Sequence, residues 1–153
     1  MKVSEIVVRD IASCRADDSL AEAARIMWDR DCGVVPVTDE EGSLCGIITD
    51  RDICMAALLQ GLPLSQVSVQ QSMSRDVHAC GPDDDVNSVH ALMRESQIRR
   101  VPVVDENRLV GIVSLNDLAM RAVSGGRNAT PSARLQVAET LAAICRHRAA
   151  AIT

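Results

Sequence analysis

Residues 46–52 read Gly-Ile-Ile-Thr-Asp-Arg-Asp, and residues 111–117 read Gly-Ile-Val-Ser-Leu-Asn-Asp. Each stretch joins a glycine and two β-branched residues to a hydroxyl side chain that precedes an aspartate by three positions. The offset between the copies is 65 residues, because 111 − 46 and 117 − 52 give the same difference. A polar signature that occurs twice in one chain predicts paired ligand sites.

The sequence before this signature is repeated as well. Its offset is 66, because 76 − 10, 83 − 17 and 102 − 36 all give 66. The matched residues include Asp10 and Asp76, Asp17 and Asp83, Met27 and Met93, Val35 and Val101, and Pro36 and Pro102. The offset changes in an acidic turn, 39–44 in the first copy and 105–109 in the second, and surface turns accept such length changes. The chain is therefore a tandem repeat.

Composition limits the fold and the partners. With 153 residues, 47% of them apolar, the chain can form a substantial core, and repeats of this length are expected to share one. The formal charge of −5 argues against an extended contact with nucleic acid. No stretch approaches the ~20 apolar residues of a membrane span, and the start lacks an apolar signal segment. We expect a cytoplasmic protein.

The cysteines and histidines form no recognisable catalytic or metal-binding pattern. Cysteines occur at 14, 32, 45, 54, 80 and 145 without a Cys-x-x-Cys pair, and the histidines at 78, 90 and 147 are scattered. Each cysteine lies in or beside an apolar run, which favours reduced core residues over disulfides. No nucleophile, base and orienting group are arranged together. We expect no enzymatic activity, no metal site and no required cofactor.

Each repeat has the same predicted order of elements. Oxygen-bearing side chains, Asp-Asp-Ser at 17–19 and Asp-Asp-Asp at 83–85, precede apolar residues at helical spacing, which predicts capped helices with one buried face. Trp28 falls in this pattern and is expected in the core. Two β-branched runs follow, 34–37 with 45–48 and 101–104 with 109–113, each pair joined by an acidic turn. Helices are then expected over 52–59 and 117–123.

A proline lies inside the first predicted strand of each repeat, at Pro36 and Pro102. Proline cannot donate a hydrogen bond to a sheet, so it belongs on an edge strand or at an interrupted position. Such a strand leaves backbone groups free to meet a ligand. Protection of a sheet edge against aggregation explains the proline equally well.

The order of helix, Val-x-Pro-Val strand, signature and helix, given twice, resembles the tandem cystathionine-β-synthase-type repeat, the CBS domain pair or Bateman module. The resemblance covers about residues 2–124 and predicts an α/β (α+β) fold. We expect β-α-β-β-α repeats at 2–67 and 68–124, packed about a pseudo-twofold axis, and a linker and C-terminal helix at 125–153. The resemblance also implies two clefts that often bind adenosine nucleotides. It further implies that two pairs associate into a disc-like homodimer.

The resemblance assigns roles to the signature residues. Asp52 and Asp117 would hold the ribose hydroxyls, since a carboxylate is a strong acceptor for two vicinal O–H groups. Thr49 and Ser114 would place a hydroxyl near the ribose or first phosphate, although N-capping of a helix explains them too. The positions implied for the base are Ala12, Ser13, Val34, Val35 and Pro36 in one cleft, and His78, Ala79, Arg100, Val101 and Pro102 in the other.

Phosphate groups require positive charge near the signatures. The candidates are Arg51, Arg99, Arg100 and Arg121, and each could equally be a solvated surface residue. The first copy has glycine and valine where the second has Arg99 and Arg100, and the second has asparagine in place of Arg51. The two clefts should therefore differ in affinity, and we expect the tighter site around Arg99, Arg100 and Asp117.

The sequence after residue 126 lies outside the repeat. Thr130 and Pro131 predict the start of a helix. Its apolar stripe consists of Leu135, Ala138, Leu141, Ala142, Cys145 and Ala149, and its solvated side of Arg134, Arg146 and Arg148. A stripe of this width must be covered, and we prefer a second subunit over the chain's own module.

Together these features predict a stand-alone regulatory module. It would bind AMP, ADP or ATP, with NAD or S-adenosylmethionine also compatible, and signal to another protein, still unidentified, by a change of shape or assembly. Two alternatives stay open: a structural or protein-interaction module without a small ligand, and an enzyme that uses the same clefts.

Overall fold

The computed structural model of the chain describes residues 1–124 and 129–146. They form two compact units that do not coincide with the two repeats. The first-repeat unit consists of residues 10–77 and 104–110, and the second-repeat unit of residues 1–9, 78–103 and 111 onward. Each unit is described by itself. The sequence-based repeat limits, 2–67 and 68–124, stay a prediction.

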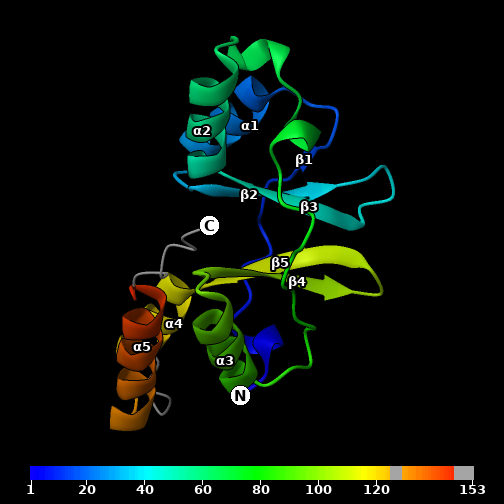
Figure 1. The fold of residues 1–153 in the computed structure, drawn as a ribbon. Helices are drawn as coiled ribbons and strands as arrows, with labels where there is room; N and C mark the ends of the chain where they lie inside the picture. The colour runs from blue at the N-terminus through cyan, green and yellow to red at the C-terminus, as the bar shows by residue number, and fades with distance from the viewer. Residues whose placement is uncertain (125–128, 147–153) are drawn as a thin grey trace. The chain divides into compact units, whose positions relative to one another are not determined.

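The first-repeat unit is a small sheet covered by helices (Figure 1). Its elements in chain order are β1 (Cys14–Arg15), α1 (Leu20–Asp29), β2 (Val34–Thr38), β3 (Leu44–Thr49) and α2 (Asp50–Gln60), followed by 3-10 turns at Leu64–Gln66 and Val69–Gln71. The sheet order is β1-β2-β3, with β1 parallel and β3 antiparallel to β2. Its core is built from Leu20, Val35, Val37, Ile48, Val67 and Val69, which are almost fully enclosed.

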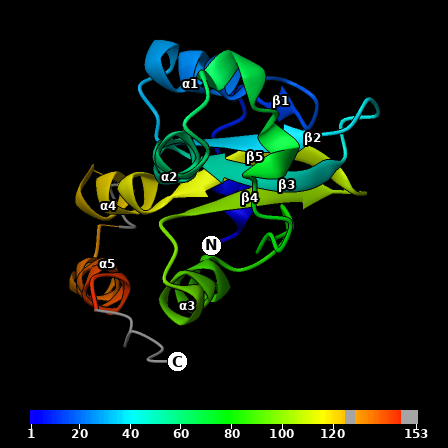
Figure 2. The same ribbon diagram turned by 45° about the horizontal axis from the view of Figure 1, so that its top comes forward.

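The second-repeat unit repeats this plan and adds a helix. Its elements are a 3-10 turn (Val3–Glu5), α3 (Val86–Ser96), β4 (Arg100–Asp105), β5 (Arg108–Ser114), α4 (Leu115–Ser124) and α5 (Pro131–Ile144), except that residues 104–110 of β4, β5 and their turn are grouped with the first-repeat unit. The strands β4 and β5 pair with each other, and Cys80 forms a parallel bridge to Val103. The helix α5 packs against both α3 and α4 (Figures 1 and 2). The predicted mixed α/β fold with a C-terminal helix is confirmed.

The segment that opens each repeat folds with the other repeat. The Val3 N–H donates to the Asp84 carbonyl over 2.9 Å, and the Val69 N–H donates to the Asp18 carbonyl over 2.8 Å. Val8 likewise bridges to β5, as Ser74 does to β3. The same bonds occur twice because the two segments are equivalent positions of the repeat. A sequence period cannot reveal this exchange, since exchanged and unexchanged segments have the same register.

The helix starts follow the predicted caps. Ser19 caps α1 in a reciprocal capping box with Glu22, and Asp85 accepts the Asn87 N–H at the start of α3. Thr130 caps α5, with Pro131 at the first helical position. These three starts are confirmed. Each cap satisfies an amide that has no partner within its helix.

Trp28 contradicts its prediction, because its side chain is 87% exposed. The helix α1 buries Leu20, Ala23 and Met27, which lie on one narrow face. At 100° per residue Trp28 is a full step away from Met27, beyond the edge of that face. The apolar pattern located the helix correctly and overestimated the width of its buried side.

Pro36 lies on the central strand of its sheet, so the edge-strand interpretation is wrong for this proline. The alternative of an interrupted position holds. The strand β1 pairs only with Val37 and Thr38, which leaves Pro36 beside the point where β1 begins. A missing N–H donor is tolerated there because the ladder on that side has ended.

The predicted apolar stripe of α5 faces outward. Leu135 is 60% and Leu141 is 48% exposed, while the fully buried residue of the helix is Thr140. Coverage of this stripe by a second subunit stays a prediction, whereas the opposite side of α5, with Thr140, packs against α3 and α4 within the chain. Apolar spacing missed this side because a threonine stands at its centre. Ala149 and Arg148 lie outside the described residues.

The cysteines are unpaired in the described part of the chain, but not all belong to the core. Cys14 and Cys80 are buried. Cys54 and Cys145 are exposed, so the prediction that they are core residues is wrong. Burial raises the pKa of the Cys14 thiol to about 12 and that of Cys80 to about 11. Both are protonated at neutral pH and therefore poor nucleophiles.

Candidate functional site

The signature of the first repeat ends a strand and begins a helix. Thr49 closes β3 and caps α2, and its Oγ1 donates to Asp52 Oδ2 over 2.7 Å. The same carboxylate oxygen accepts the Thr49 N–H at 2.9 Å, while the Asp52 N–H donates to Thr49 Oγ1 at 3.2 Å. This reciprocal pair is a capping box. Thr49 and Asp52 therefore cap α2, as the capping interpretation of the signature predicts.

The second repeat builds the same geometry with serine. Ser114 Oγ donates to Asp117 Oδ2 over 2.5 Å, and the Ser114 N–H donates to that oxygen over 2.8 Å. The Asp117 N–H completes the box at 3.2 Å from Ser114 Oγ. Corresponding distances in the two copies agree within 0.2 Å. The arrangement is therefore a property of the signature.

Capping leaves half of each carboxylate free. Only Oδ2 of Asp52 and of Asp117 accepts hydrogen bonds from described residues, and neither aspartate takes part in an ion pair there. Both side chains are half-buried. A free carboxylate oxygen accepts hydroxyl hydrogens, and the adjoining helix N-terminus favours anionic groups. Each signature can thus cap its helix and still receive a ligand diol.

The other predicted residues of the first site gather at the beginning of β2. Val34 is the register partner of Thr49, so the strand start lies beside the signature. Because β1 runs parallel to β2 from Cys14 onward, the preceding Ala12 and Ser13 lie toward the same end. The side chain of Val35 belongs to the hydrophobic core, so its contact with a ligand would be through its backbone.

The second site has equivalent neighbours in its own unit. The Leu115 N–H donates to the Arg99 carbonyl over 2.9 Å, which places the start of α4 beside the residues before β4. The Cys80 N–H donates to the Pro102 carbonyl over 3.0 Å, so the exposed His78 and Ala79 approach the other side of that strand. Arg100 is half-buried, and Val101 is fully buried.

A cavity of ≈ 380 Å³ opens beside Asp117. Its lining is Glu5, Ile6, Val7, Asp117, Met120, Arg121 and Ser124. Of these, the sequence motifs point to the aspartate and the arginine only. The other lining residues come from the N-terminal segment that folds with the second repeat and from the outer side of α4. The exchange of segments, invisible in the sequence, explains why Glu5, Ile6 and Val7 were missed.

The two sites differ in charge where the strand meets the helix. In the first, Gly33 lies against Asp50, and a Cβ on this glycine would come 2.7 Å from the Asp50 carboxylate. In the second, the equivalent residues are Arg99 and the buried Leu115. The first site therefore carries an additional carboxylate beside Arg51, whereas the second has two arginines and no acid at that point. This difference favours the second site for an anionic ligand.

The sequence model of the CBS domain matches residues 3–59 and 65–124. The chain belongs to the CBS domain family. It is 37% identical over 122 residues to the CBS domain-containing protein YhcV of Bacillus subtilis, covering 80% of this chain and 86% of that protein. The CBS domain pair of protein MJ0100, solved in complex with 5'-methylthioadenosine and S-adenosyl-L-methionine, aligns with a TM-score of 0.72 and 31% identity, covering 83% of this chain and 98% of that one.

An enzyme is also among the relatives of this CBS domain pair. Inosine-5'-monophosphate dehydrogenase of Methanocaldococcus jannaschii is 33% identical over 121 residues, which cover 78% of this chain but 23% of the enzyme. The similarity is thus confined to a minor part of that protein. Among the described residues, no helix is long and apolar enough to cross a membrane, and no cluster of three or more His, Cys, Asp or Glu could hold a metal ion.

Proposed function

We propose that this CBS domain pair is a regulatory module that binds an adenosine-type nucleotide through its signatures. The observation that carries the proposal is the half-free carboxylate of Asp52 and of Asp117. Each is fixed through Oδ2 by its own capping box, while Oδ1 has no donor from the described residues. Two vicinal ribose hydroxyls supply the donors that such an oxygen lacks. The adenosine compounds bound by the MJ0100 pair support this choice of ligand class.

The second site is the stronger candidate for a ligand with phosphates. Asp117 would hold the ribose, and Arg99, Arg100 and Arg121 are the cations nearest to the start of α4 in sequence. Val101 and Pro102, with His78 and Ala79 on the neighbouring segment, would contact the base. In the first site Thr49, Asp52 and Arg51 would act alike, with Ala12, Ser13, Val34, Val35 and Pro36 around the base. AMP, ADP and ATP are the first ligands to test, then NAD and S-adenosylmethionine.

The module would act by population shift rather than by chemistry. A ligand that favours one conformation changes the equilibrium by no more than its difference in affinity between the states. The buried thiols of Cys14 and Cys80, next to the base positions, are held protonated and supply no nucleophile. We therefore assign no catalytic residue and no required cofactor. The responding partner is another protein, and unpaired cysteines suit a reducing cytoplasm.

Thermal unfolding with these five adenosine compounds tests the proposal. A ligand present at a hundred times its dissociation constant should stabilise the chain by about 2.7 kcal/mol. Asp117→Asn keeps an oxygen that can accept the Ser114 N–H, and it replaces the free oxygen by an amide donor. This variant should retain its stability within about 1 kcal/mol and lose at least roughly tenfold in affinity.

Asp52→Asn is the matched variant of the first site, and Glu95→Gln on α3 controls for loss of surface charge. If none of the five ligands raises the unfolding temperature, nucleotide binding is wrong. Consumption of a nucleotide on incubation would instead indicate an enzyme. Equal losses from Glu95→Gln and Asp117→Asn would show that net charge, and not the signature, determines binding.

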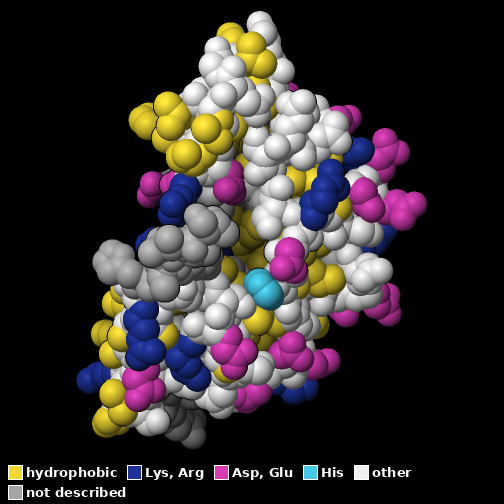
Figure 3. Space-filling view, in the orientation of Figure 1, with side chains coloured by type: hydrophobic (Ala, Val, Ile, Leu, Met, Phe, Trp, Pro, Cys, Tyr) yellow, Lys and Arg dark blue, Asp and Glu magenta, His cyan; other side chains and the backbone are white. Residues whose placement is uncertain are grey.

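A protein-interaction role has its own supporting observation. Met55, Leu58 and Leu59 on α2 and Trp28 on α1 are exposed, and hydrophobic side chains gather over α2 in Figure 3. Exposed apolar groups of this kind mark interaction surfaces. We propose that this surface supports a homodimer. Light scattering of the Leu58→Ser, Leu59→Ser double variant should give a smaller mass than that of the parent chain, and equal masses would exclude this surface.

A further inference from the structure

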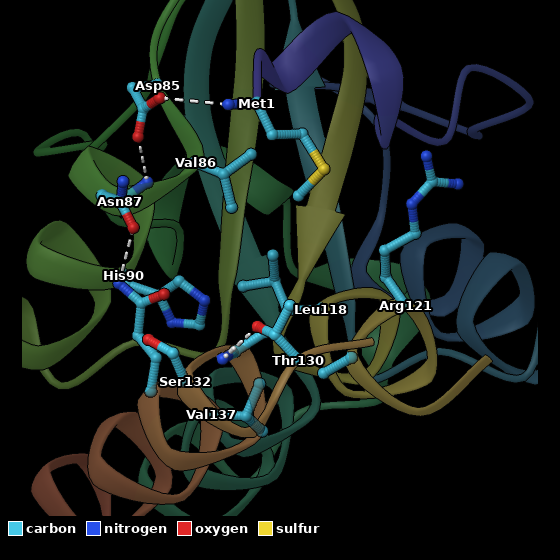
Figure 4. Close-up of a pocket in the computed structure, with 13 residues that line it drawn as sticks. Met1, Asp85, Val86, Asn87, His90, Leu118, Arg121, Thr130, Ser132 and Val137 are labelled. Carbon is cyan, nitrogen blue, oxygen red and sulfur yellow. Dashed lines mark hydrogen bonds and ion pairs between the residues drawn. The ribbon is translucent and has the colours of Figure 1, made fainter. Parts of the chain in front are cut away.

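A second cavity, of ≈ 240 Å³, lies among α3, α4 and the start of α5 in the second-repeat unit (Figure 4). Its lining is Met1, Asp85, Val86, Asn87, His90, Leu118, Arg121, Ala122, Thr130, Ser132, Ala133, Gln136 and Val137. None of the predicted ribose or base positions belongs to it, and Arg121, a predicted phosphate contact, lines both cavities. Its volume is below the ~300–1,000 Å³ of drug-sized ligand sites, so an occupant would be smaller than a nucleotide.

The proton of the His90 ring is fixed by a chain of hydrogen bonds. Thr140 Oγ1 lies 2.8 Å from the Gln136 carbonyl oxygen and also 2.8 Å from His90 Nδ1. Two oxygens at this distance require a proton between them, and the hydroxyl has only one, which it donates to Gln136. The Nδ1 atom must therefore carry its own hydrogen and donate it to Thr140. Neutral His90 then has its lone pair on Nε2.

This lone pair has no donor among the described residues. His90 is 3% exposed. Its side chain forms one hydrogen bond with the described residues, from Nδ1 to Thr140. In the described part of the chain, no fully enclosed side-chain nitrogen or oxygen lacks a partner, so Nε2 must border open space. The cavity that His90 lines is that space. Burial, with a smaller contribution from Arg94, lowers the pKa of His90 to about 4, so the lone pair persists at neutral pH.

The rest of the lining offers a cation and an apolar wall. Figure 4 shows His90 and Arg121 on opposite sides of Leu118. Neither Arg121 nor the hydroxyl of Ser132 forms a hydrogen bond or ion pair with the described residues. Val86, Leu118 and Val137 supply the apolar surface between the polar groups. An occupant must therefore donate a hydrogen bond at one end, and it can place negative charge at the other.

We propose that this cavity binds a small carboxylate that carries a hydroxyl or ammonium group. The hydroxyl or ammonium group donates to His90 Nε2, the carboxylate contacts Arg121, and the carbon atoms between them pack on Leu118. The ligand class follows from the donor missing at His90 Nε2 and from the Arg121 guanidinium, which is unpaired among the described residues. The proposal does not depend on nucleotide binding at the signatures.

The test compares three-carbon acids that differ in their donor. L-lactate carries a hydroxyl where pyruvate has a carbonyl acceptor and propionate has neither, and L-serine carries both an ammonium group and a hydroxyl. In the full chain labelled with ¹⁵N, lactate and serine should move the Nε2 resonance of His90 in a saturable way. Pyruvate and propionate should bind at least about tenfold more weakly, because they leave a buried acceptor unpaired.

Variants assign the other end of the ligand. Arg121→Gln should weaken binding of lactate at least fivefold, while Arg25→Gln, on the exposed side of α1, should leave it unchanged. Three results would overturn the proposal: no movement of the His90 resonance with any of the four acids, equal affinity for lactate and pyruvate, or crystals soaked in lactate that show only water at Nε2. The comparison of acids uses the unaltered chain, so it does not depend on the folding of a variant.

Discussion

The outer faces of α1 and α3 occupy equivalent positions of the repeat, but α1 has mostly apolar and α3 polar side chains there. The corresponding residues are Ala21 and Asn87, Ala24 and His90, Trp28 and Arg94, and Asp31 and Gln97, since 87 − 21, 90 − 24, 94 − 28 and 97 − 31 all give 66. Three positions on α3 and the residue that follows it, Gln97, bond to α5 or to the residues just after it. Asn87 accepts from Gln136, His90 and Arg94 donate to Thr140, and Gln97 donates to the carbonyls of Ala143 and Arg146.

This difference shows how a repeat protein directs an additional helix to one copy. Buried polar groups are stable only when they are paired, so α5 with its central Thr140 requires polar partners on the helix below it. The helix α3 provides them. The helix α1 has alanine and tryptophan at the positions equivalent to Asn87, His90 and Arg94, so it offers no polar partner to Thr140 there and keeps an apolar outer face. Selectivity for the second repeat thus rests on side-chain hydrogen bonds.

The largest effect should come from the core beneath these faces. Met93 is fully buried, whereas its counterpart Met27 is 7% exposed. Met93→Ala should therefore cost about 3–5 kcal/mol of unfolding free energy, and Met27→Ala should cost less, nearer the ~2 kcal/mol end of the range for such truncations. Urea denaturation of both variants measures the difference. A larger loss for Met27→Ala would show that the second-repeat unit is not the better packed of the two.

Next is the pairing between α3 and α5. Thr140→Val keeps the shape of the side chain and removes the acceptor of the His90 Nδ1–H, so a buried donor is left unpaired at a cost of about 1–3 kcal/mol. Thr140→Ser is the matched control, because it keeps the hydroxyl and should lose less than about 1 kcal/mol. Similar losses in both variants would assign the effect to the methyl group instead.

The same pair predicts a dependence on pH that the first repeat lacks. The pKa of His90 is lowered from 6.5 to about 4 in the folded chain, so the unfolded chain binds the proton first as the pH falls. Stability is therefore complete above pH 6.5 and is lost down to about pH 4, which amounts to about 2 kcal/mol between pH 7.5 and pH 5.

His90→Leu should abolish most of this loss. Its counterpart in the first repeat is Ala24, which cannot titrate, and the lowered carboxylate pKa values of Asp83, Asp85 and Glu22 affect stability only at more acidic pH. Urea midpoints at the two pH values, for the parent and the variant, provide the measurement. An unchanged pH dependence in His90→Leu would place the titrating group elsewhere.

Local patterns predicted much of this molecule. The repeat, the caps at Ser19, Asp85 and Thr130 and the strands around each proline depend on neighbouring residues, and they were found from spacing alone. The hydroxyl and the aspartate of each signature do lie together, because three residues at a helix start bring them within hydrogen-bonding distance.

Features that depend on distant residues were not predictable in this way. The exchange of opening segments leaves the repeat register unchanged, so the contact of Ile6 and Val7 with the cavity at Asp117 has no signal in the sequence. The docking of α5 was missed because Thr140 is polar, and Trp28 was misplaced because an apolar residue beside a buried face was counted as part of it. One signal in the sequence could have predicted that α5 covers α3. His90 and Arg94 are polar, whereas the equivalent residues of the first repeat, Ala24 and Trp28, are apolar.

The smallest effect is expected for Trp28, which lies on the exposed outer face of α1. Trp28→Gln should change the unfolding free energy by no more than about 0.5 kcal/mol, because the side chain is almost entirely exposed. Arg94→Gln, at the equivalent position on α3, should cost about 1 kcal/mol, since it loses its bond to Thr140. Trp28 is the single tryptophan, so emission at submicromolar concentration should be red-shifted and readily quenched by iodide. Protection that grows with concentration would indicate that a second copy covers α1, whereas blue-shifted emission at every dilution would mean that the chain itself buries this face.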